Sequence, residues 1–403
     1  MALPLSNEKL QEALDAYAKH GNQRQAAAAL GIPRVTFQAR LDSARVRLNV
    51  GGLTSKIDAT LQGQVKRLEA ELKRANQQSA DAAAIKAIIG GLCERTATLE
   101  APRWLNSKLS KASSPGVPTL FLSDFHWGEV VHPGQINGVN RYNLAIARDR
   151  LQYTVETGIH LCKILDRDMD YPGIVVPLGG DMISGNIHEE LAATNELNTM
   201  PTVLDLYGQL IVAIERLADA FGHVFLPCVT GNHGRDTRKT WAKDRHHTSF
   251  DWLLYQFLAK HFERDRRITF FIPDGSDAAY RIYDYRYLLT HGDQFSGGDG
   301  MIGALGPIIR GDHRKRSRNM QIDMEYDTLL LGHWHQLMML TRLIVNGSLK
   351  GYDEYAYTGN FPFELPTQGL WVTHPRHGIT YRMPVYATSQ PKPKSKDWVS
   401  IQR

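Results

Sequence analysis

The sequence predicts an α/β protein whose main domain is preceded by a small all-α domain. Two observations lead to this prediction. Residues 6–47 have the apolar spacing and the stop signals of three helices. From about residue 118, short apolar runs alternate with helical patterns, and this β-α-β order is typical of a sheet whose loops carry the chemistry at one edge. The predicted boundaries are 1–50 for the helical domain, 51–112 for a helical linker, 113–388 for the main domain and 389–403 for a basic disordered tail.

Composition narrows the class of protein. The chain has 403 residues and a formal net charge of +5, which permits nucleic-acid binding without requiring it. Cys93, Cys162 and Cys228 form no C-x-x-C pair, so neither a disulfide framework nor a thiolate zinc site is indicated. The first residues do not show a basic n-region followed by an apolar h-region, so no secretory signal is expected. No apolar run approaches the ~20 residues that cross a bilayer. We expect a cytoplasmic setting and no membrane partner.

The first domain contains residues that are typical of the starts and ends of three short helices. Ser6 is expected to cap the first helix and Gly21 to end it, and the second helix covers residues 23–30. Gly31 makes the next turn, and Pro33 suits the first turn of the third helix, where its missing N–H costs nothing. In the third helix, the side chains expected to face inward are Val35, Phe37 and Leu41, and those expected to face outward are Arg34, Gln38 and Arg40.

The order helix, glycine turn, helix is the pattern of a DNA-binding motif. The run from Gln25 to Thr36 resembles the Fis-type helix-turn-helix of many bacterial DNA-binding proteins. This resemblance implies a third helix that enters the major groove. The implied DNA contacts are Arg34, Thr36, Gln38 and Arg40. A three-helix module for protein interaction is the alternative.

Residues 57–80 have a heptad-like spacing of apolar positions, at Leu61, Val65, Leu68, Leu72 and Ala75. About two heptads fit either a homodimer through 57–80 or a single helix packed on its own protein. A dimer would suit a helix-turn-helix protein, because DNA half-sites are usually read in pairs.

In the main domain the predicted elements alternate regularly. Strands are expected at 119–123, 173–178, 224–229, 281–289 and 328–331, and helices at 141–165, 201–221 and 248–264. Short polar motifs follow most of the strands. They are Asp124-Phe125-His126, Gly180-Asp181, Gly231-Asn232-His233, His291-Gly292 and Gly332-His333-Trp334-His335. Each motif alone is more often a turn or a surface histidine. All five in order predict one shared site for a pair of divalent metals, since carboxylate, amide and imidazole ligands suit such ions.

These five blocks resemble the pattern of the calcineurin-like metallophosphoesterases, which is D-x-H, G-D, G-N-H-(D/E), H and G-H-x-H. The resemblance spans residues 124–335. It implies a β-sandwich flanked by helices and two metals bridged by an aspartate. Carried over, one metal would be held by Asp124, His126 and His335, the second by Asn232, His291 and His333, with Asp181 as the bridge. Mn²⁺ is the first choice for these ligands, with Fe, Zn or Ni as alternatives.

The resemblance also implies catalytic roles. His233 would be a general acid or a donor to the phosphoryl oxygen. One position departs from the family, because Gly234 stands where an acidic residue usually follows G-N-H. We expect Asp236 or His188 to supply the contact that supports His233.

Basic segments favour nucleic acid as the substrate. Two loops are expected to open near the metals. The first carries Arg235, Arg238 and Lys239, and the second carries Arg314, Lys315 and Arg316.

The resulting interpretation is a dimetal-dependent DNA phosphodiesterase, a nuclease, brought to DNA by its N-terminal domain. Its catalytic blocks are similar to those of SbcD-type repair nucleases, and the domain combination resembles phage and prophage proteins, which would place it in the host cytoplasm. The alternatives are a protein or nucleotide phosphomonoesterase and a DNA-binding regulator with an inactive phosphoesterase domain.

Overall fold

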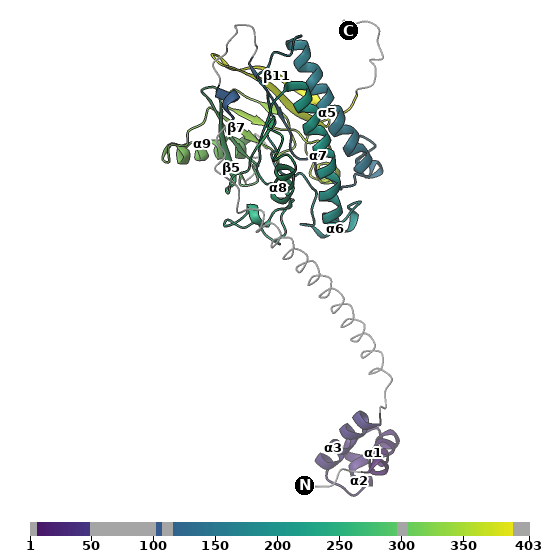
Figure 1. The fold of residues 1–403 in the computed structure, drawn as a ribbon. Helices are drawn as coiled ribbons and strands as arrows, with labels where there is room; N and C mark the ends of the chain where they lie inside the picture. Colours follow the sequence, from purple (N-terminus) through teal and green to yellow (C-terminus); the bar gives the residue numbers. More distant parts are fainter. Residues whose placement is uncertain (1–5, 49–101, 107–115, 296–304, 390–403) are drawn as a thin grey trace, which may run out of the picture. The chain divides into compact units, whose positions relative to one another are not determined.

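The computed structural model describes residues 6–48, 102–106, 116–295 and 305–389 (Figure 1). The chain divides into two compact units, Met1–Arg95 and Thr96–Arg403, and each is described here by itself. The predicted dimer segment 57–80, nearly all of the predicted linker and tail residues 390–403 lie outside the described residues. Among the helices of the described ranges, none combines the length and apolar character that crossing a bilayer requires.

The first unit contains the three predicted helices, α1 Asn7–His20, α2 Gln23–Ala29 and α3 Arg34–Arg47. Gly21 ends α1 in the left-handed conformation with φ 62°, as its position predicts. Asn22, which the sequence reading did not single out, caps α2 by accepting hydrogen bonds from two backbone N–H groups. Ser6 precedes α1 without a side-chain cap, and Pro33 lies one position before α3 rather than inside it.

The core of this unit confirms two of the three expected inward positions on α3. Phe37 and Leu41 are fully buried with Ala13, Ala26 and Ala27. Val35 was expected to face inward, but its side chain is 82 % exposed. Because α3 turns about 100° per residue, Val35 lies on the opposite side of the helix from the buried Phe37.

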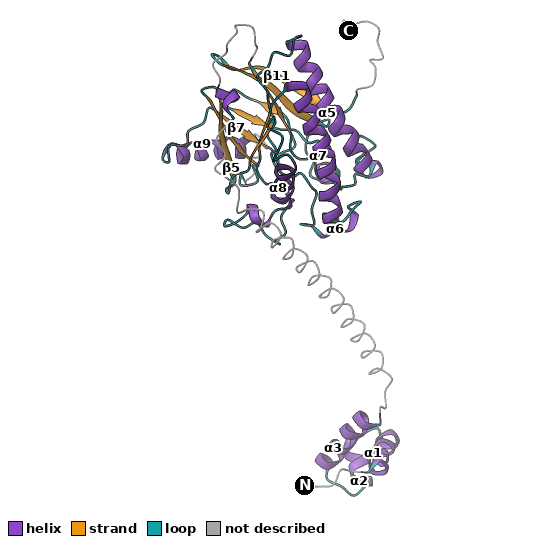
Figure 2. Cartoon of the chain, viewed as in Figure 1, coloured by secondary structure: helices purple, strands orange, loops and turns teal. Residues whose placement is uncertain are grey.

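The second unit is a sandwich of two mixed sheets, as predicted. One sheet has the order β11-β10-β1-β2-β3-β4 and the other has β5-β6-β7-β9-β8 (Figure 2). The strands of the first sheet are β1 Val117–Phe121, β2 Ile174–Val175, β3 Val224–Pro227, β4 Ile268–Phe271, β10 Thr367–His374 and β11 Gly378–Tyr386. Those of the second sheet are β5 Asp277–Ile282, β6 Tyr285–Thr290, β7 Thr328–Leu331, β8 Met338–Met339 and β9 Leu343–Val345.

Apolar side chains of the two sheets meet in a shared core, which includes Phe121 and Trp371 from one sheet and Leu289 and Leu330 from the other. Helices cover both outer faces. The first sheet packs against α5 Leu144–Leu165, α7 Thr199–Phe221 and α8 Phe250–His261. The second sheet packs against α9 Leu305–Met320. Figure 2 shows the strands between α9 on one side and α5 and α7 on the other. The short helical segments are η1 Arg103–Asn106, η2 Pro133–Gln135, α6 Glu189–Thr194, η3 His246–Thr248 and α10 Glu354–Thr358.

Two predicted elements have a different form. The run 281–289 was expected to be one strand, but it turns at Tyr283, where φ is 55°, and becomes the end of β5 and most of β6. The basic run 310–318 was expected to be a loop, but it lies within α9, whose buried face includes Ile308, Lys315 and Asn319. The helix was not predicted because most of its residues are charged or polar, and the apolar stripe that packs on the sheet is narrow.

The topology explains why the polar motifs meet. Strands β1, β2, β3 and β4 are parallel, and so are β6, β7 and β9. The five motifs lie at the carboxyl ends of β1, β2, β3, β6 and β7, or a few residues beyond them. Side chains from both sheets are therefore delivered to one edge of the sandwich.

Candidate metal centre

The first group of side chains at this edge contains Asp124, His126 and His335. One ligand atom from each lies within 4.8 Å of the others. His126 Nε2 and His335 Nε2 are 3.0 Å apart, and His335 Nε2 is 3.5 Å from Asp124 Oδ1. The structure thus brings together the three residues proposed for one metal, two from the loop after β1 and one from the loop after β7.

The second group contains Asp181, His291 and His333, whose ligand atoms also lie within 4.8 Å of one another. His291 Nε2 is 3.0 Å from Asp181 Oδ2 and 3.1 Å from Asn232 Oδ1. Asp181 belongs as well to a group with His126 and His233. It therefore lies between the two proposed ion positions, where a bridging ligand would have to be.

The donor and acceptor pattern fits a cation at each position. His291 Nδ1 lies 2.8 Å from the Gly179 carbonyl and must donate to it, so Nε2 faces the oxygens of Asp181 and Asn232. Two imidazole nitrogens 3.0 Å apart, as in His126 and His335, repel each other unless a proton or a cation lies between them. Carboxylate, amide oxygen and imidazole are ligands that first-row divalent metals accept.

Burial and neighbouring charge shift the pKa values of these groups strongly. Burial opposes ionisation of Asp181, but His291 and His233 outweigh it and hold its pKa well below the usual range. Burial favours neutral His291, yet Asp181 raises its pKa to about 10. Burial, reinforced by Lys350, lowers the pKa of His126 to about 3. Without metal, these shifts keep the Asp181 carboxylate ionised and His126 neutral, which are the forms that bind metal. His291 is protonated in the same state and would have to release a proton when a metal binds.

Five of the seven proposed ligands have left-handed backbones although none is glycine. The φ values are 54° at Asp124, 48° at His126, 50° at Asp181, 67° at His333 and 53° at His335. Each such residue stores on the order of 1–3 kcal/mol and persists only where its surroundings enforce it. Strain of this kind gathers at functional sites, and it is not visible in the sequence.

The segment 340–388, for which no motif was found, positions Asp124. Asn346 donates to Ser123 Oγ at 2.9 Å, and Ser123 Oγ donates to Asp124 Oδ2 at 2.5 Å. Ser348 Oγ donates to the Asp124 carbonyl at 2.9 Å. The loop after β9 therefore fixes both the carboxylate and the backbone of this proposed ligand.

Glu129 is a residue of the candidate site that the sequence analysis missed. Its carboxylate is 3.4 Å from His126 Nδ1 and accepts a hydrogen bond of 2.8 Å from Lys350, and all three side chains are buried. A carboxylate behind a ligating imidazole fixes the ring and leaves the other nitrogen for the metal. Lys350 also forms an ion pair with Asp353. Since 221 residues separate Glu129 from Lys350, no local pattern could reveal this contact.

Asp251 is the second missed residue. It lies in the first turn of α8, is fully buried, and accepts hydrogen bonds from three backbone N–H groups. The donors are Asp181 at 3.0 Å, Met182 at 3.2 Å and Gly231 at 2.9 Å. Burial and the charge of Asp181 raise the pKa of Asp251 to about 7. This carboxyl joins the loops after β2 and β3, which carry the second proposed metal position. From sequence, an acidic residue in a first helical turn signals only a helix start.

His233 faces the first metal position. Its ring centroid is 4.5 Å from that of His126, and its backbone N–H donates to Asp181 Oδ1 at 2.7 Å. His233 Nδ1 lies 3.0 Å from the Ser184 carbonyl, which can only accept, so this nitrogen carries a proton. Burial is the largest influence on His233 and lowers its pKa.

The support expected for His233 has a different source. Ser184, rather than Asp236 or His188, makes the contact with its Nδ1. His188 is exposed at the start of α6, and its ring centroid is 6.3 Å from that of His233. The Asp236 side chain is exposed, and its backbone N–H donates to Thr248. His188 is therefore near His233 without bonding to the nitrogen that Ser184 occupies.

The glycine at position 234 is required by Asp251. A Cβ placed on Gly234 would lie 2.8 Å from Asp251 Oδ1. We therefore expect Gly234→Asp, which would restore the acidic residue of the family pattern, to lower both stability and metal affinity instead of improving them. Thermal unfolding and metal titration of Gly234→Asp and Gly234→Ala would check this, with Gly208→Ala as the control because no atom lies within 4 Å of its added Cβ. Higher metal affinity in Gly234→Asp would contradict the expectation.

The residues proposed for DNA contact divide into exposed and structural ones. Exposed side chains belong to Arg34, Thr36, Arg238, Lys239 and Arg314. Other proposed contacts are engaged within the protein. Gln38 bonds to Asp42 on its own helix, Arg40 is partly buried, and Arg235 donates to carbonyls of its own loop.

Lys315 and Arg316 were predicted to contact DNA, and the structure shows that this prediction is wrong. Lys315 is only 6 % exposed and forms an ion pair of 2.7 Å with Asp277 of β5. Arg316 stacks over Tyr326 and donates to Asp312 and to the carbonyls of Tyr326 and Arg342. Both side chains attach α9 to the second sheet, so neither is presented to a DNA backbone.

Replacing Lys315 by Met is expected to reduce the free energy of unfolding by about 2–3 kcal/mol. Removing one partner of a buried ion pair costs ~3–5 kcal/mol of stability. The loss should be smaller here, because Arg318 remains 2.8 Å from Asp277 and still compensates its charge. Burial opposes ionisation of Asp277, but the charge of Lys315 outweighs burial and lowers the pKa of Asp277. The stability that this ion pair contributes is therefore fully present above the pKa of Asp277 in the unfolded chain, and it is lost as pH falls through the lower pKa of the folded protein. Urea unfolding would measure the loss. Arg314→Met, exposed on the same helix, should change stability by less than ~0.5 kcal/mol, and equal effects would contradict the assignment.

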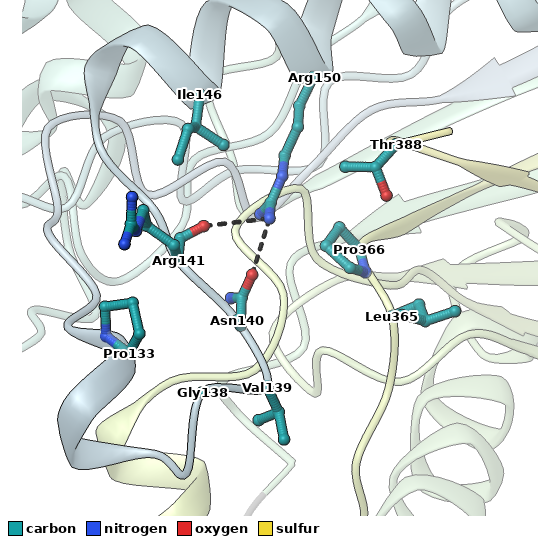
Figure 3. A pocket seen from close by; sticks show the side chains of 10 residues that line it. All are labelled: Pro133, Gly138, Val139, Asn140, Arg141, Ile146, Arg150, Leu365, Pro366 and Thr388. Atoms are coloured by element: carbon teal, nitrogen blue, oxygen red, sulfur yellow. Dashed lines mark hydrogen bonds between the residues drawn. The ribbon is translucent and has the colours of Figure 1, made fainter. Parts of the chain in front are cut away.

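A surface pocket lies apart from the proposed ligands. Figure 3 shows its lining, and its volume is about 410 Å³. Arg150 of α5 reaches into it and donates to Asn140 Oδ1 and to the Arg141 carbonyl. The same guanidinium donates to the carbonyls of Leu349 and Lys350. Its role is thus to hold the loop that carries Lys350 toward Glu129.

Comparisons with known proteins give distant structural similarities. A predicted phosphoesterase from Streptococcus pneumoniae is 10 % identical with a TM-score of 0.25, covering 64 % of this chain and 84 % of that one. A variant of Vps29 from Entamoeba histolytica is 14 % identical with a TM-score of 0.27, covering 66 % and 99 %. The sulfate thiohydrolase SoxB from Thermus thermophilus is 11 % identical with a TM-score of 0.29, covering 70 % and 57 %. No protein-family model and no curated protein matches the chain. Similarities this distant assign no activity, so the functional conclusion depends on the residues of the site.

Proposed function

We propose that this chain is a dimetal-dependent phosphodiesterase that hydrolyses DNA, with the fold and site of the calcineurin-like phosphoesterases. The observation that carries the proposal is a pair of Asp/His groups, Asp124 with His126 and His335 and Asp181 with His291 and His333. A third group, in which Asp181 meets His126 and His233, connects them. Two divalent ions held there, with Mn²⁺ as first choice, would supply an activated water and charge stabilisation for in-line displacement at phosphorus.

The protein's own groups prepare this chemistry. Asp251 and Ser123 hold the loops and the Asp124 carboxylate in place, so little reorganisation is needed when substrate binds. His233 keeps its proton on Nδ1 toward Ser184, which leaves Nε2 free to face a substrate. A phosphate anion beside it would offset the burial that lowers its pKa, and Nε2 could then take up a proton and deliver it to the leaving oxygen.

DNA is the proposed substrate because basic groups are exposed in both units. The segment after His233 presents Arg238 and Lys239, together with Trp241, whose side chain is 55 % exposed and suits stacking on unpaired bases. On α3 of the first unit, Arg34 and Thr36 are exposed at its N-terminal end, which is the end that contacts base edges in helix-turn-helix proteins. We propose that this unit targets the enzyme to duplex DNA in the cytoplasm.

The proposal is tested by incubating the full chain with supercoiled plasmid and with labelled single strands, with and without Mn²⁺. Nicking or degradation that needs both the metal and Asp181 is the expected result, with Asp181→Ala as the inactive control. Arg34→Ala should weaken plasmid binding while leaving hydrolysis of a small phosphodiester unchanged.

Two results would overturn parts of the proposal. Metal-dependent hydrolysis of a small phosphomonoester without any DNA cleavage would identify a phosphatase. Plasmid binding without hydrolysis of any phosphoester, at full metal content, would identify a DNA-binding regulator with an inactive domain.

A further inference from the structure

A second cluster of metal-ligating side chains lies on residues that the proposed dimetal centre does not use. It contains His246 and His247 of η3 and Asp274 of the turn between β4 and β5. One ligand atom from each of these three residues lies within 4.8 Å of the others. The turn that carries Asp274 is also where the chain passes from the first sheet to the second. We propose that this cluster is a third metal site that binds Zn²⁺.

The state of His246 is the independent observation that points to a ligand. The residue is only 7 % exposed, and its Nε2 has no hydrogen-bond partner. A buried ring nitrogen without a partner is unfavourable unless something satisfies it. The His246 ring also lies beside that of His247, with the two ring centroids 3.9 Å apart.

The ligand set fits zinc. Two imidazoles and a carboxylate, completed by water, make a tetrahedral N₂O₂ site of a kind that Zn²⁺ accepts. With metal–ligand bonds of ~2.0–2.1 Å, tetrahedral ligand atoms lie roughly 3.3 Å apart. The atoms here need to approach by at most ~1.5 Å, which a change of side-chain rotamer at the exposed His247 and Asp274 can supply. His247 would then leave Asp244, whose Oδ1 lies 4.0 Å from its Nδ1.

The site would fix residues 235–249, called here the basic segment, to the sandwich. Residues 235–249 leave the dimetal loop at Arg235 and return at Ser249, which forms a bridge with Arg235. Arg245, adjacent to His246, donates to the Gly231 carbonyl and pairs with Asp293. A metal joining η3 to Asp274 would hold the exposed Arg238 and Lys239 in a fixed place relative to the sandwich. The role is structural and does not depend on which phosphoester the enzyme cleaves.

The test counts zinc in the full-length protein. Wild type and variants are stripped with chelator, dialysed against Zn²⁺ and analysed for bound metal. His247→Gln and Asp274→Asn change exposed side chains, so both variants should fold, and each is expected to bind one zinc fewer per chain than wild type. His377→Gln is the matched control, since His377 is an exposed histidine stacked on His374 at 4.7 Å outside the cluster. Its zinc content should equal that of wild type.

Limited proteolysis measures whether bound zinc holds the basic segment in place. Trypsin cleaves after Lys and Arg, and the segment 238–243 offers exposed sites. Zinc should slow this cleavage in wild type at least several-fold more than in His247→Gln. Asp181→Ala separates this site from the dimetal proposal, because it should lose zinc at the dimetal centre and keep the loop protection. Equal zinc content in wild type, His247→Gln and Asp274→Asn would overturn the third site.

Discussion

Replacing Asp251 by Ala is expected to lower the free energy of unfolding by about 3–5 kcal/mol. The carboxyl is fully buried and accepts hydrogen bonds from the backbone N–H groups of Asp181, Met182 and Gly231. Without it three buried donors lose their acceptor, and each costs ~1–3 kcal/mol before the loops relax. Asp251→Asn should also destabilise, because one side of its amide presents N–H groups to N–H donors.

Urea unfolding and metal titration together measure this effect. Because Asp251 joins the loops after β2 and β3, metal affinity should fall along with stability. Asp149→Ala is the control, since Asp149 is exposed on α5 and should change stability by less than ~0.5 kcal/mol. A stable Asp251→Ala protein with unchanged metal affinity would show that the loops hold their place without this carboxyl.

Replacing Asp181 by Ala is expected to reduce metal-dependent hydrolysis at least ~10³-fold, at the upper end of what one electrostatic stabiliser supplies. Asp181 belongs to two of the ligand groups and lies 3.0 Å from His291 Nε2. It also accepts the backbone N–H of His233 at 2.7 Å, so the change disturbs both the proposed bridge and the proposed proton donor.

The conservative variant separates these two roles. Asp181→Asn keeps an oxygen that can accept from His233 but removes the charge between the metal positions. Both variants should show reduced metal content by elemental analysis, and Asp181→Asn should retain more of the wild-type stability. Hydrolysis by Asp181→Ala at more than a tenth of the wild-type rate, with full metal content, would exclude Asp181 as the bridge.

Much of the architecture was predictable because it depends on local periodicity and on strand order. The three helices of the first unit, the helices near 141–165, 201–221 and 248–264, and the two-sheet sandwich flanked by helices are all present. The seven proposed ligands follow strands that the sequence marks as apolar runs, and parallel strand order delivers their side chains to one edge. The hairpin at Tyr283 was missed because one apolar alternation runs through its turn.

The sequence by itself determined which candidate ligand types this protein carries, in what order, and at which strand ends. Only the tertiary structure decided what holds them: Glu129 behind His126, Asp251 between two loops, and Ser184 on His233. It also showed that Lys315 is a buried structural cation and that five ligands have strained backbones. The physical reason is that burial and partner choice depend on contacts between distant segments, such as the 221 residues between Glu129 and Lys350, whereas residue type and spacing are local.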